Sequence, residues 1–192
     1  MGLSLVTGPT TEPVTLEEVK AHLRVAIADD DGLIAGYILA ARRYAEGYTR
    51  RAFCTQTWDY TVDRCWPWEN VWGYVRKRIT LPLPPLQVVS SVSYVDIDGA
   101  TQTLDSSQYV VKTDETSGYI EEAYNVTWPD VRYVASAVTV RFVAGWAQVP
   151  DEIRMAIMLH VEILYDRNPQ DLNLLMSARD ALLAPYLVVR IF

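Results

Sequence analysis

Residues 13–51 read PVTLEEVKAHLRVAIADDDGLIAGYILAARRYAEGYTRR, a stretch that predicts two amphipathic helices joined by an acidic turn. Thr15 and Glu18 have the spacing of a capping box, in which each side chain accepts a hydrogen bond from the backbone N–H of the other residue. The apolar positions expected to be buried are Leu16, Val19, Leu23 and Ile27 in the first helix, and Leu33, Tyr37, Ala41, Ala45 and Tyr48 in the second. No catalytic constellation accompanies them, so the pair indicates packing and assembly.

The acidic turn allows two interpretations. Asp29, Asp30 and Asp31 lie at the start of the second helix. Carboxylates there stabilise a helix, because they interact favourably with the positive end of its dipole and accept hydrogen bonds from its free N–H groups. Clustered carboxylates also bind calcium or magnesium, but a calcium loop needs alternating oxygen ligands and a terminal bidentate glutamate. Here Gly32 is followed by Leu33 and further apolar residues. We therefore expect helix capping and no metal site.

Composition limits the class of protein. The chain has 192 residues, of which 50% are hydrophobic, and a formal net charge of −7. This length suits one domain with an insertion, or two small domains. No apolar run approaches the ~20 residues that cross a bilayer, and residues 1–14 lack the pattern of a secretion signal. We expect no membrane association and a product that stays in the cell that makes it.

The sequence contains no recognisable enzyme site. The motifs GxGxxG, GxxxxGK[ST], HExxH and GxSxG are absent. The acidic pairs at 114–115 and 121–122 fall in polar, turn-like surroundings that are typical of a solvated face. His22 and His160 lie in helical patterns without a nucleophile partner, as structural histidines do. We therefore expect neither enzymatic activity nor a cofactor.

The two cysteines do not indicate a metal site. Cys54 and Cys65 are eleven residues apart, with no second cysteine pair and no neighbouring histidine, so they cannot form a zinc site. Free, partly buried thiols are expected, because disulfides are rare in proteins that are not secreted. A disulfide remains an alternative if a hairpin brings the two thiols together.

The apolar pattern changes from helical to alternating after Arg51, which predicts a β-rich region. The expected strands are 56–63, 75–81, 88–96, 108–112 and 137–143, with residues 96–99 closing a hairpin onto 100–104. Pro82, Pro84 and Pro85 lack backbone donors and indicate an edge or an extended connection.

A tryptophan-rich segment, WPWENVWGY at 66–74, interrupts this region and is followed by the basic residues Arg76, Lys77 and Arg78. Aromatic and basic side chains together can bind nucleic acid or sugar, which makes a carbohydrate- or nucleic-acid-binding module the alternative function. The net charge of −7 and the isoelectric point of about 4.8 argue against it. We favour rings that cap the sheet or contact a neighbouring subunit or partner; the candidates are Trp66, Trp68, Trp72 and Tyr74.

Helical periodicity returns near Pro150, which suits a first helical position. The expected buried residues are Ile153, Ile157, Val161 and Leu164 in a third helix, and Leu172, Leu175, Met176, Leu182 and Leu183 in a fourth that ends before Pro185. The fold class is therefore α+β, a four-helix bundle-like core (two N-terminal and two C-terminal helices) with a central antiparallel β insertion. The expected parts are 1–54 (N-terminal helices), 55–147 (β insertion), 148–184 (C-terminal helices) and 185–192 (tail).

This arrangement resembles the head-to-tail connector, or adaptor, proteins of long-tailed bacteriophages. The resemblance covers nearly the whole chain. It is carried by PVTLEEVKAHLRV (13–25), AARRYAEGYTRRAF (40–53), TQTWDYTVD (55–63), ITLPLPPLQVVSSVSYVDIDG (79–99), AVTVRFVAGW (137–146), VPDEIRMAIMLHVEILYDRN (149–168) and LLAPYLVVRIF (182–192). These motifs describe packing and not chemistry, but their order and spacing together are specific.

The resemblance implies a structural virion protein that self-associates into a roughly twelve-fold ring under the portal protein and extends the DNA channel toward the tail. The implied partners are the portal and a head-closure (stopper) or tail-completion protein, with DNA passing through without specific binding. The implied location is the head-to-tail interface of the virion, reached from the host bacterial cytoplasm during assembly. An acidic chain fits a channel that does not retain phosphates.

The C-terminal tail is too apolar to remain in water, so it is expected to dock. In the resembled adaptors this segment reaches toward the portal, which makes its residues the candidate portal-docking site: Tyr186, Leu187, Val188, Val189, Arg190, Ile191 and Phe192. An extended apolar peptide can add a strand to a partner or fill pockets on it. The alternative is packing against the chain's own core.

Overall fold

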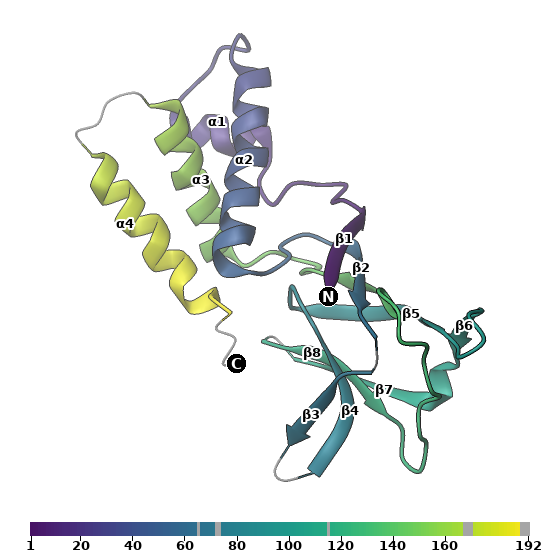
Figure 1. Cartoon of the computed structure of the whole chain (residues 1–192). Helices are drawn as coiled ribbons and strands as arrows, with labels where there is room; N and C mark the ends of the chain where they lie inside the picture. Colours follow the sequence, from purple (N-terminus) through teal and green to yellow (C-terminus); the bar gives the residue numbers. More distant parts are fainter. Residues whose placement is uncertain (65, 72–73, 115, 167–170, 189–192) are drawn as a thin grey trace. The chain divides into compact units, whose positions relative to one another are not determined.

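The computed structural model describes residues 1–64, 66–71, 74–114, 116–166 and 171–188, and only the backbone within 68–71 and 74–76. It contains two compact units, each assembled from two stretches of chain (Figure 1). The β unit consists of Met1–Gly8 and Thr55–Gly145, and the helical unit consists of Pro9–Cys54 and the chain from Trp146 onward. The expected division assigned residues 1–8 to the helical part, whereas they contribute a strand to the β unit.

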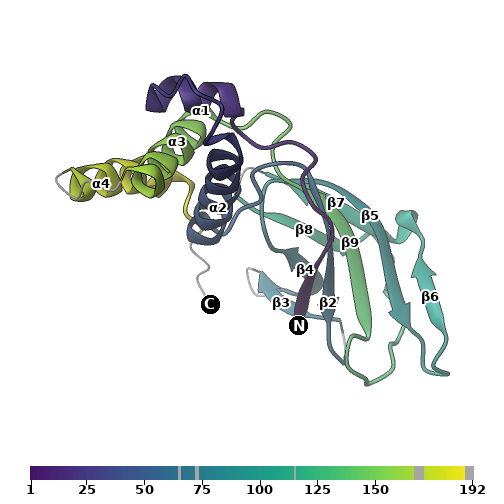
Figure 2. The ribbon, with the colours of Figure 1, turned by 90° about the horizontal axis from the view of Figure 1, so that it is seen from above.

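The helical unit holds α1 (Leu16–Leu23), α2 (Asp31–Thr49), α3 (Asp151–Tyr165) and α4 (Leu172–Leu183), followed by a short 3-10 turn at Ala184–Tyr186. In Figures 1 and 2, α3 lies between α2 and α4 and contacts both. The N-terminal and C-terminal helix pairs therefore share one core, although about a hundred residues separate them in the sequence. This confirms the expected α+β class, with two helices before the β insertion in the sequence and two after it.

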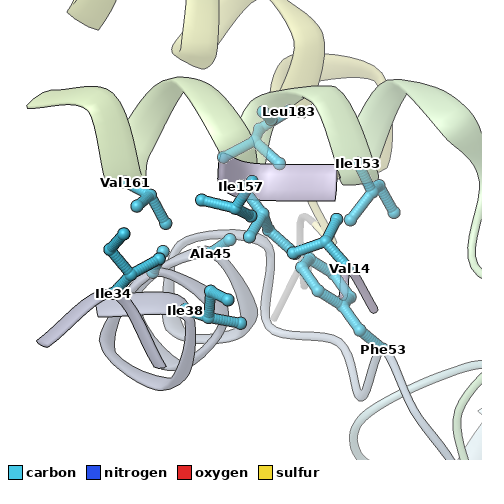
Figure 3. Packing of buried hydrophobic residues seen from close by; sticks show 12 residues of the cluster. Val14, Ile34, Ile38, Ala45, Phe53, Ile153, Ile157, Val161 and Leu183 are labelled. Atoms are coloured by element: carbon cyan, nitrogen blue, oxygen red, sulfur yellow. The ribbon is translucent and has the colours of Figure 1, made fainter. Parts of the chain in front are cut away.

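Apolar side chains from all four helices, and from the segments just before α1 and after α2, form the helical core (Figure 3). Its fully or almost fully buried members include Val14, Val19, Ile34, Ile38, Ala41, Ala45, Phe53, Ile153, Ile157, Val161 and Leu183. The stripe expected on α2 was wrong by one position at its start, since Leu33 is 48% exposed and Ile34 is buried. One residue turns a helix by about 100°, so burying Ile34 and Ile38 rotates Leu33 and Tyr48 outward. Leu164 and Met176 are exposed as well, contrary to expectation.

The start of α1 follows the sequence prediction. The Thr15 hydroxyl accepts from the N–H of Glu18, and the Glu18 carboxylate accepts from the N–H of Thr15 at 2.9 Å. The helix then ends at Leu23 because Arg24 adopts a left-handed conformation with φ of 58°. Ile27, expected on the buried face, lies beyond that end and is 59% exposed.

The acidic turn does not cap α2 with a side chain as predicted. Asp30 occupies the N-cap position but makes no side-chain cap hydrogen bond. Its carboxylate instead accepts from the hydroxyl of Tyr165 on α3 at 2.7 Å, and Asp31 is paired with Lys20 of α1. Asp30 and Asp31 therefore join α1, α2 and α3 at one end of the helical unit.

The β unit contains two antiparallel sheets. The first has the order β1-β2-β9-β5-β6, formed by Gly2–Thr7, Gln56–Val62, Val138–Ala144, Leu86–Val95 and Thr101–Leu104. The second has the order β3-β4-β8-β7, formed by Trp68–Val71, Tyr74–Leu81, Gly118–Glu122 and Tyr109–Thr113. Each predicted strand is present to within two residues at each end. The strands β1, β3 and β8 were not predicted.

The two sheets approach each other closely where β8 faces β5. A side chain at Gly118 would clash with Leu86, because an added Cβ would lie 2.5 Å from the Leu86 Cβ. Between the sheets lie the buried residues Tyr60, Val62, Ile79, Leu81, Val92, Ile120, Trp128, Val138, Val140 and Phe142. The proline-rich stretch after Leu81 connects β4 to β5, as expected. Within the described residues, no helix combines the length and apolarity needed to cross a membrane.

Candidate docking surfaces

The first half of the tail packs on its own helical unit. The backbone carbonyl of Tyr186 accepts a 2.6 Å hydrogen bond from Arg51 Nε, and its ring meets Trp146 edge-on at 6.0 Å. The Tyr186 hydroxyl donates to Glu152 at 3.1 Å, and the N–H of Val188 donates to the carbonyl of Thr49 at 3.0 Å. Residues 186–188 thus follow the self-packing alternative. Val189, Arg190, Ile191 and Phe192 lie outside the described residues, so their docking stays a prediction.

A buried ion network supports the segment that the tail packs on. Arg42 of α2 is 5% exposed, and its guanidinium binds Glu12 at 2.7 Å and Glu46 at 2.6 Å. The other oxygen of Glu46 accepts from the backbone N–H of Phe53 at 2.9 Å. The Glu46 carboxylate therefore joins Arg42 of α2 to the chain that follows the helix, at Phe53.

The tryptophan-rich segment is divided between core and hairpin. Trp66 is 3% exposed, packs on Trp128 with ring centroids 4.5 Å apart, and donates from Nε1 to the carbonyl of Pro129 at 2.7 Å. For Trp66 this burial favours the sheet-capping interpretation. Trp68 and Tyr74 lie in β3 and β4, which pair as a hairpin in register Trp68↔Lys77. Trp72 lies outside the described residues, so the subunit contact stays a prediction.

The cations after that segment are engaged within the chain. Lys77 is 8% exposed and donates from Nζ to the carbonyl of Trp128 at 2.9 Å, with Glu122 at 3.6 Å. Arg78 pairs with Glu121 at 2.9 Å and lies over the ring of Tyr119. Both neutralising carboxylates belong to β8, although their polar sequence surroundings predict a solvated turn. These two cations are therefore poorly placed to bind phosphates, and the nucleic-acid alternative loses its strongest support.

Both histidines have structural partners. His22 of α1 lies 2.8 Å from Glu162 of α3. His160 is buried, stacks on Tyr44, and has its Nδ1 2.9 Å from Nη1 of Arg179. Burial, together with the Arg179 charge, lowers the pKa of His160 to about 4. It is therefore a neutral acceptor at ordinary pH.

Nothing in the described residues forms a reactive or metal-binding centre. Burial raises the pKa of the Cys54 thiol to about 11, so it stays protonated at neutral pH and is a poor nucleophile. Cys65 lies outside the described residues, so a disulfide with it is untested. Within the described part of the chain, no three His, Cys, Asp or Glu side chains gather as a metal site would require.

The comparison with protein families decides the class of protein. A family model described as "Phage gp6-like head-tail connector protein" matches residues 13–116, which is more than half of the chain. The chain belongs to this family of head-tail connectors. Because the family is structural, this also confirms that the connector is not an enzyme. No curated protein matches the chain.

Solved structures share the connector's fold over its whole length. A chain from "Neck of empty GTA particle computed with C6 symmetry" is 22% identical with a TM-score of 0.77, and the match covers 100% of the connector and 98% of that chain. A chain from "Virion of native gene transfer agent (GTA) particle" is 21% identical with a TM-score of 0.77 and the same coverage. A third, from "Neck of native GTA particle computed with C12 symmetry", is 21% identical with a TM-score of 0.73 and the same coverage. At these identities the matches establish the fold.

Proposed function

We propose that the connector forms a ring of roughly twelve copies under the portal, at the neck of a phage-like particle, and extends the DNA channel toward the tail. The family match carries this proposal. Support comes from the whole-chain likeness to chains of particle necks, one of them computed with C12 symmetry. The proposed partners are the portal above and a head-closure (stopper) or tail-completion protein below.

The charge of the chain suits a wall along which DNA slides. A basic wall would bind phosphates by releasing counterions, which retains DNA more tightly as positive charges are added. The connector has a net charge of −7, and Lys77 and Arg78 are already paired with carboxylates. We therefore infer that DNA passes without specific binding.

The end of the tail is the proposed portal-docking element. Residues 186–188 are anchored on the helical unit by hydrogen bonds to Arg51 and Thr49, which fixes the point from which the chain continues. The sequence that follows, Val189-Arg190-Ile191-Phe192, contains three large apolar residues that can fill pockets or add a strand to a partner.

Truncating the tail after Val188 tests this proposal. A variant that ends at Val188 keeps the Tyr186 contacts and should keep the fold, whereas removing Tyr186 would disturb the packing around Trp146 and Arg51. We expect the shortened connector to melt like the full chain but to lose co-sedimentation with the portal. A second variant, Ile191→Ser with Phe192→Ser, keeps the length and should lose binding too. Undiminished co-sedimentation of both variants would exclude the tail as the docking element.

A further inference from the structure

The strand β1 is an exposed and unprotected sheet edge. It lies at one side of its sheet (Figure 2) and pairs only with β2 among the described strands. All six of its residues are exposed. Leu3, Leu5 and Val6 are 40%, 51% and 44% exposed. Leu3 and Leu5 lie opposite Tyr60 and Trp58 in the register, so they continue the apolar face of the sheet beyond its last covered strand.

Native proteins usually protect such an edge. Lysine, proline or an inward-pointing charge on the outer strand prevents unpaired N–H and C=O groups from pairing with another chain. The β1 sequence GLSLVT has none of these residues. Its free edge and its exposed leucines therefore suit strand addition, in which backbone hydrogen bonds supply affinity.

The opposite edge of the same sheet is β6, which pairs with β5. Thr101, Gln102 and Thr103 are exposed on it, and Leu104 is buried. Four antiparallel pairings separate β1 from β6, so the two edge strands run in the same direction. Figure 2 shows them at the two sides of the sheet.

We propose that β1 of one connector pairs with β6 of the next copy, so that the sheets join from subunit to subunit around the ring. This inference rests on the proposed ring and names the strands that form its contact. A contact between two different surfaces of one chain is heterologous, and such contacts close into rings. Each step of a many-membered ring turns a copy by a small angle, so strand direction is preserved and the new pairing is parallel.

Charge favours a second copy as the occupant of the edge. Copies with a net charge of −7 repel each other over most surfaces, so they associate best where neither surface is charged. Neither β1, GLSLVT, nor β6, TQTL, contains a charged residue. Two β1 strands meeting in a two-fold dimer would instead pair antiparallel and leave β6 free.

Amide hydrogen exchange on the full chain, alone and assembled on purified portal, tests the pairing. Peptides covering β1 and β6 should both become strongly protected in the ring, because outward N–H groups gain partners. Protection of β1 alone, or of neither strand, in rings that form would contradict the inference and leave the proposed function intact. A wild-type chain that fails to join the portal would overturn both.

Substitutions test the same contact independently. Leu5→Lys places a charge on the edge at a half-exposed position and should abolish rings on the portal while leaving the melting temperature unchanged. Val88→Lys is the matched control, since Val88 is also 51% exposed but lies on β5, outside both strands of the proposed pairing. Rings formed equally well by Leu5→Lys would refute the pairing, as would equal loss in both variants.

Discussion

Arg51 Nε donates a 2.6 Å hydrogen bond to the backbone carbonyl oxygen of Tyr186, joining two positions 135 residues apart in the sequence. The Arg51 guanidinium also lies 5.5 Å from the ring centroid of Trp146, and Arg51 is 5% exposed. This residue therefore fastens the chain after α2 to the start of the tail. The contact determines where the proposed docking segment leaves the helical unit.

Replacing that guanidinium should loosen the tail. Arg51→Met keeps the apolar stem but leaves the Tyr186 carbonyl without this donor, which should lower the free energy of unfolding by about 1–3 kcal/mol. Hydrogen exchange at Leu187 and Val188 should accelerate. Arg50→Met is the control, because Arg50 is the exposed neighbour. Equal stability and equal exchange in the two variants would show that Arg51 does not anchor the tail.

Buried Arg42 and its exposed neighbour Arg43 should differ strongly in what they contribute to stability. Arg42→Leu removes the partner of Glu12 and Glu46, and an unpaired, partly buried carboxylate is costly, so we expect a loss of about 3 kcal/mol in urea unfolding. Arg43→Leu, one residue along on the exposed face, should change stability by less than about 0.5 kcal/mol. Similar losses for both substitutions would mean that the ion network contributes nothing specific.

His160 should make stability depend on pH. Its pKa in the folded protein is about 4, below the usual 6.5, so as pH falls the unfolded chain binds a proton first. The free energy of unfolding that depends on neutral His160 is fully present above pH 6.5. It falls as the pH is lowered from 6.5 to 4, by up to about 3 kcal/mol.

Unfolding free energies of the wild type and His160→Gln across that range measure this effect, because their difference cancels the carboxylates common to both. The glutamine oxygen can still accept from Arg179. The difference should change steadily between pH 6.5 and 4. A difference that is constant with pH would contradict the buried, neutral state of His160.

Removing the capping box of α1 should lower the stability of the protein by a smaller amount. Thr15→Ala removes the acceptor for the Glu18 N–H, which should cost about 1 kcal/mol, as N-cap substitutions commonly do. Thr11→Ala, at an exposed threonine outside the helices, serves as the control. Thermal melts that coincide for Thr15→Ala and the wild type would indicate that α1 is held by packing alone.

Local signals explain which features were predictable from sequence. Thr15 and Glu18 form their capping box because both partners lie within one helical turn. The alternating strands were located well because their apolar residues face the space between the sheets. On α2, by contrast, Leu33 and Ile34 begin two adjacent apolar stripes, and only contact with Ile157 and Val161 of α3 selects the second.

The missed features depend on partners distant in sequence. The strand β1 carries no burial pattern, because all of its residues are exposed, and only its pairing with β2 defines it. Glu121 and Glu122 resembled a solvated turn, but they lie on β8, where Arg78 and Lys77 of β4 neutralise them. The capping role expected for Asp30 is wrong because its carboxylate instead accepts a hydrogen bond from Tyr165, which lies more than a hundred residues away in the sequence.

Electron microscopy of the connector mixed with purified portal is the decisive test of the proposed ring. The portal must be present, because a chain that is monomeric alone can still assemble on its partner. We expect a ring of connector density, roughly twelve-fold and coaxial with the portal, whose channel continues that of the portal. Portal particles that remain bare at connector concentrations well above those of the portal would contradict it.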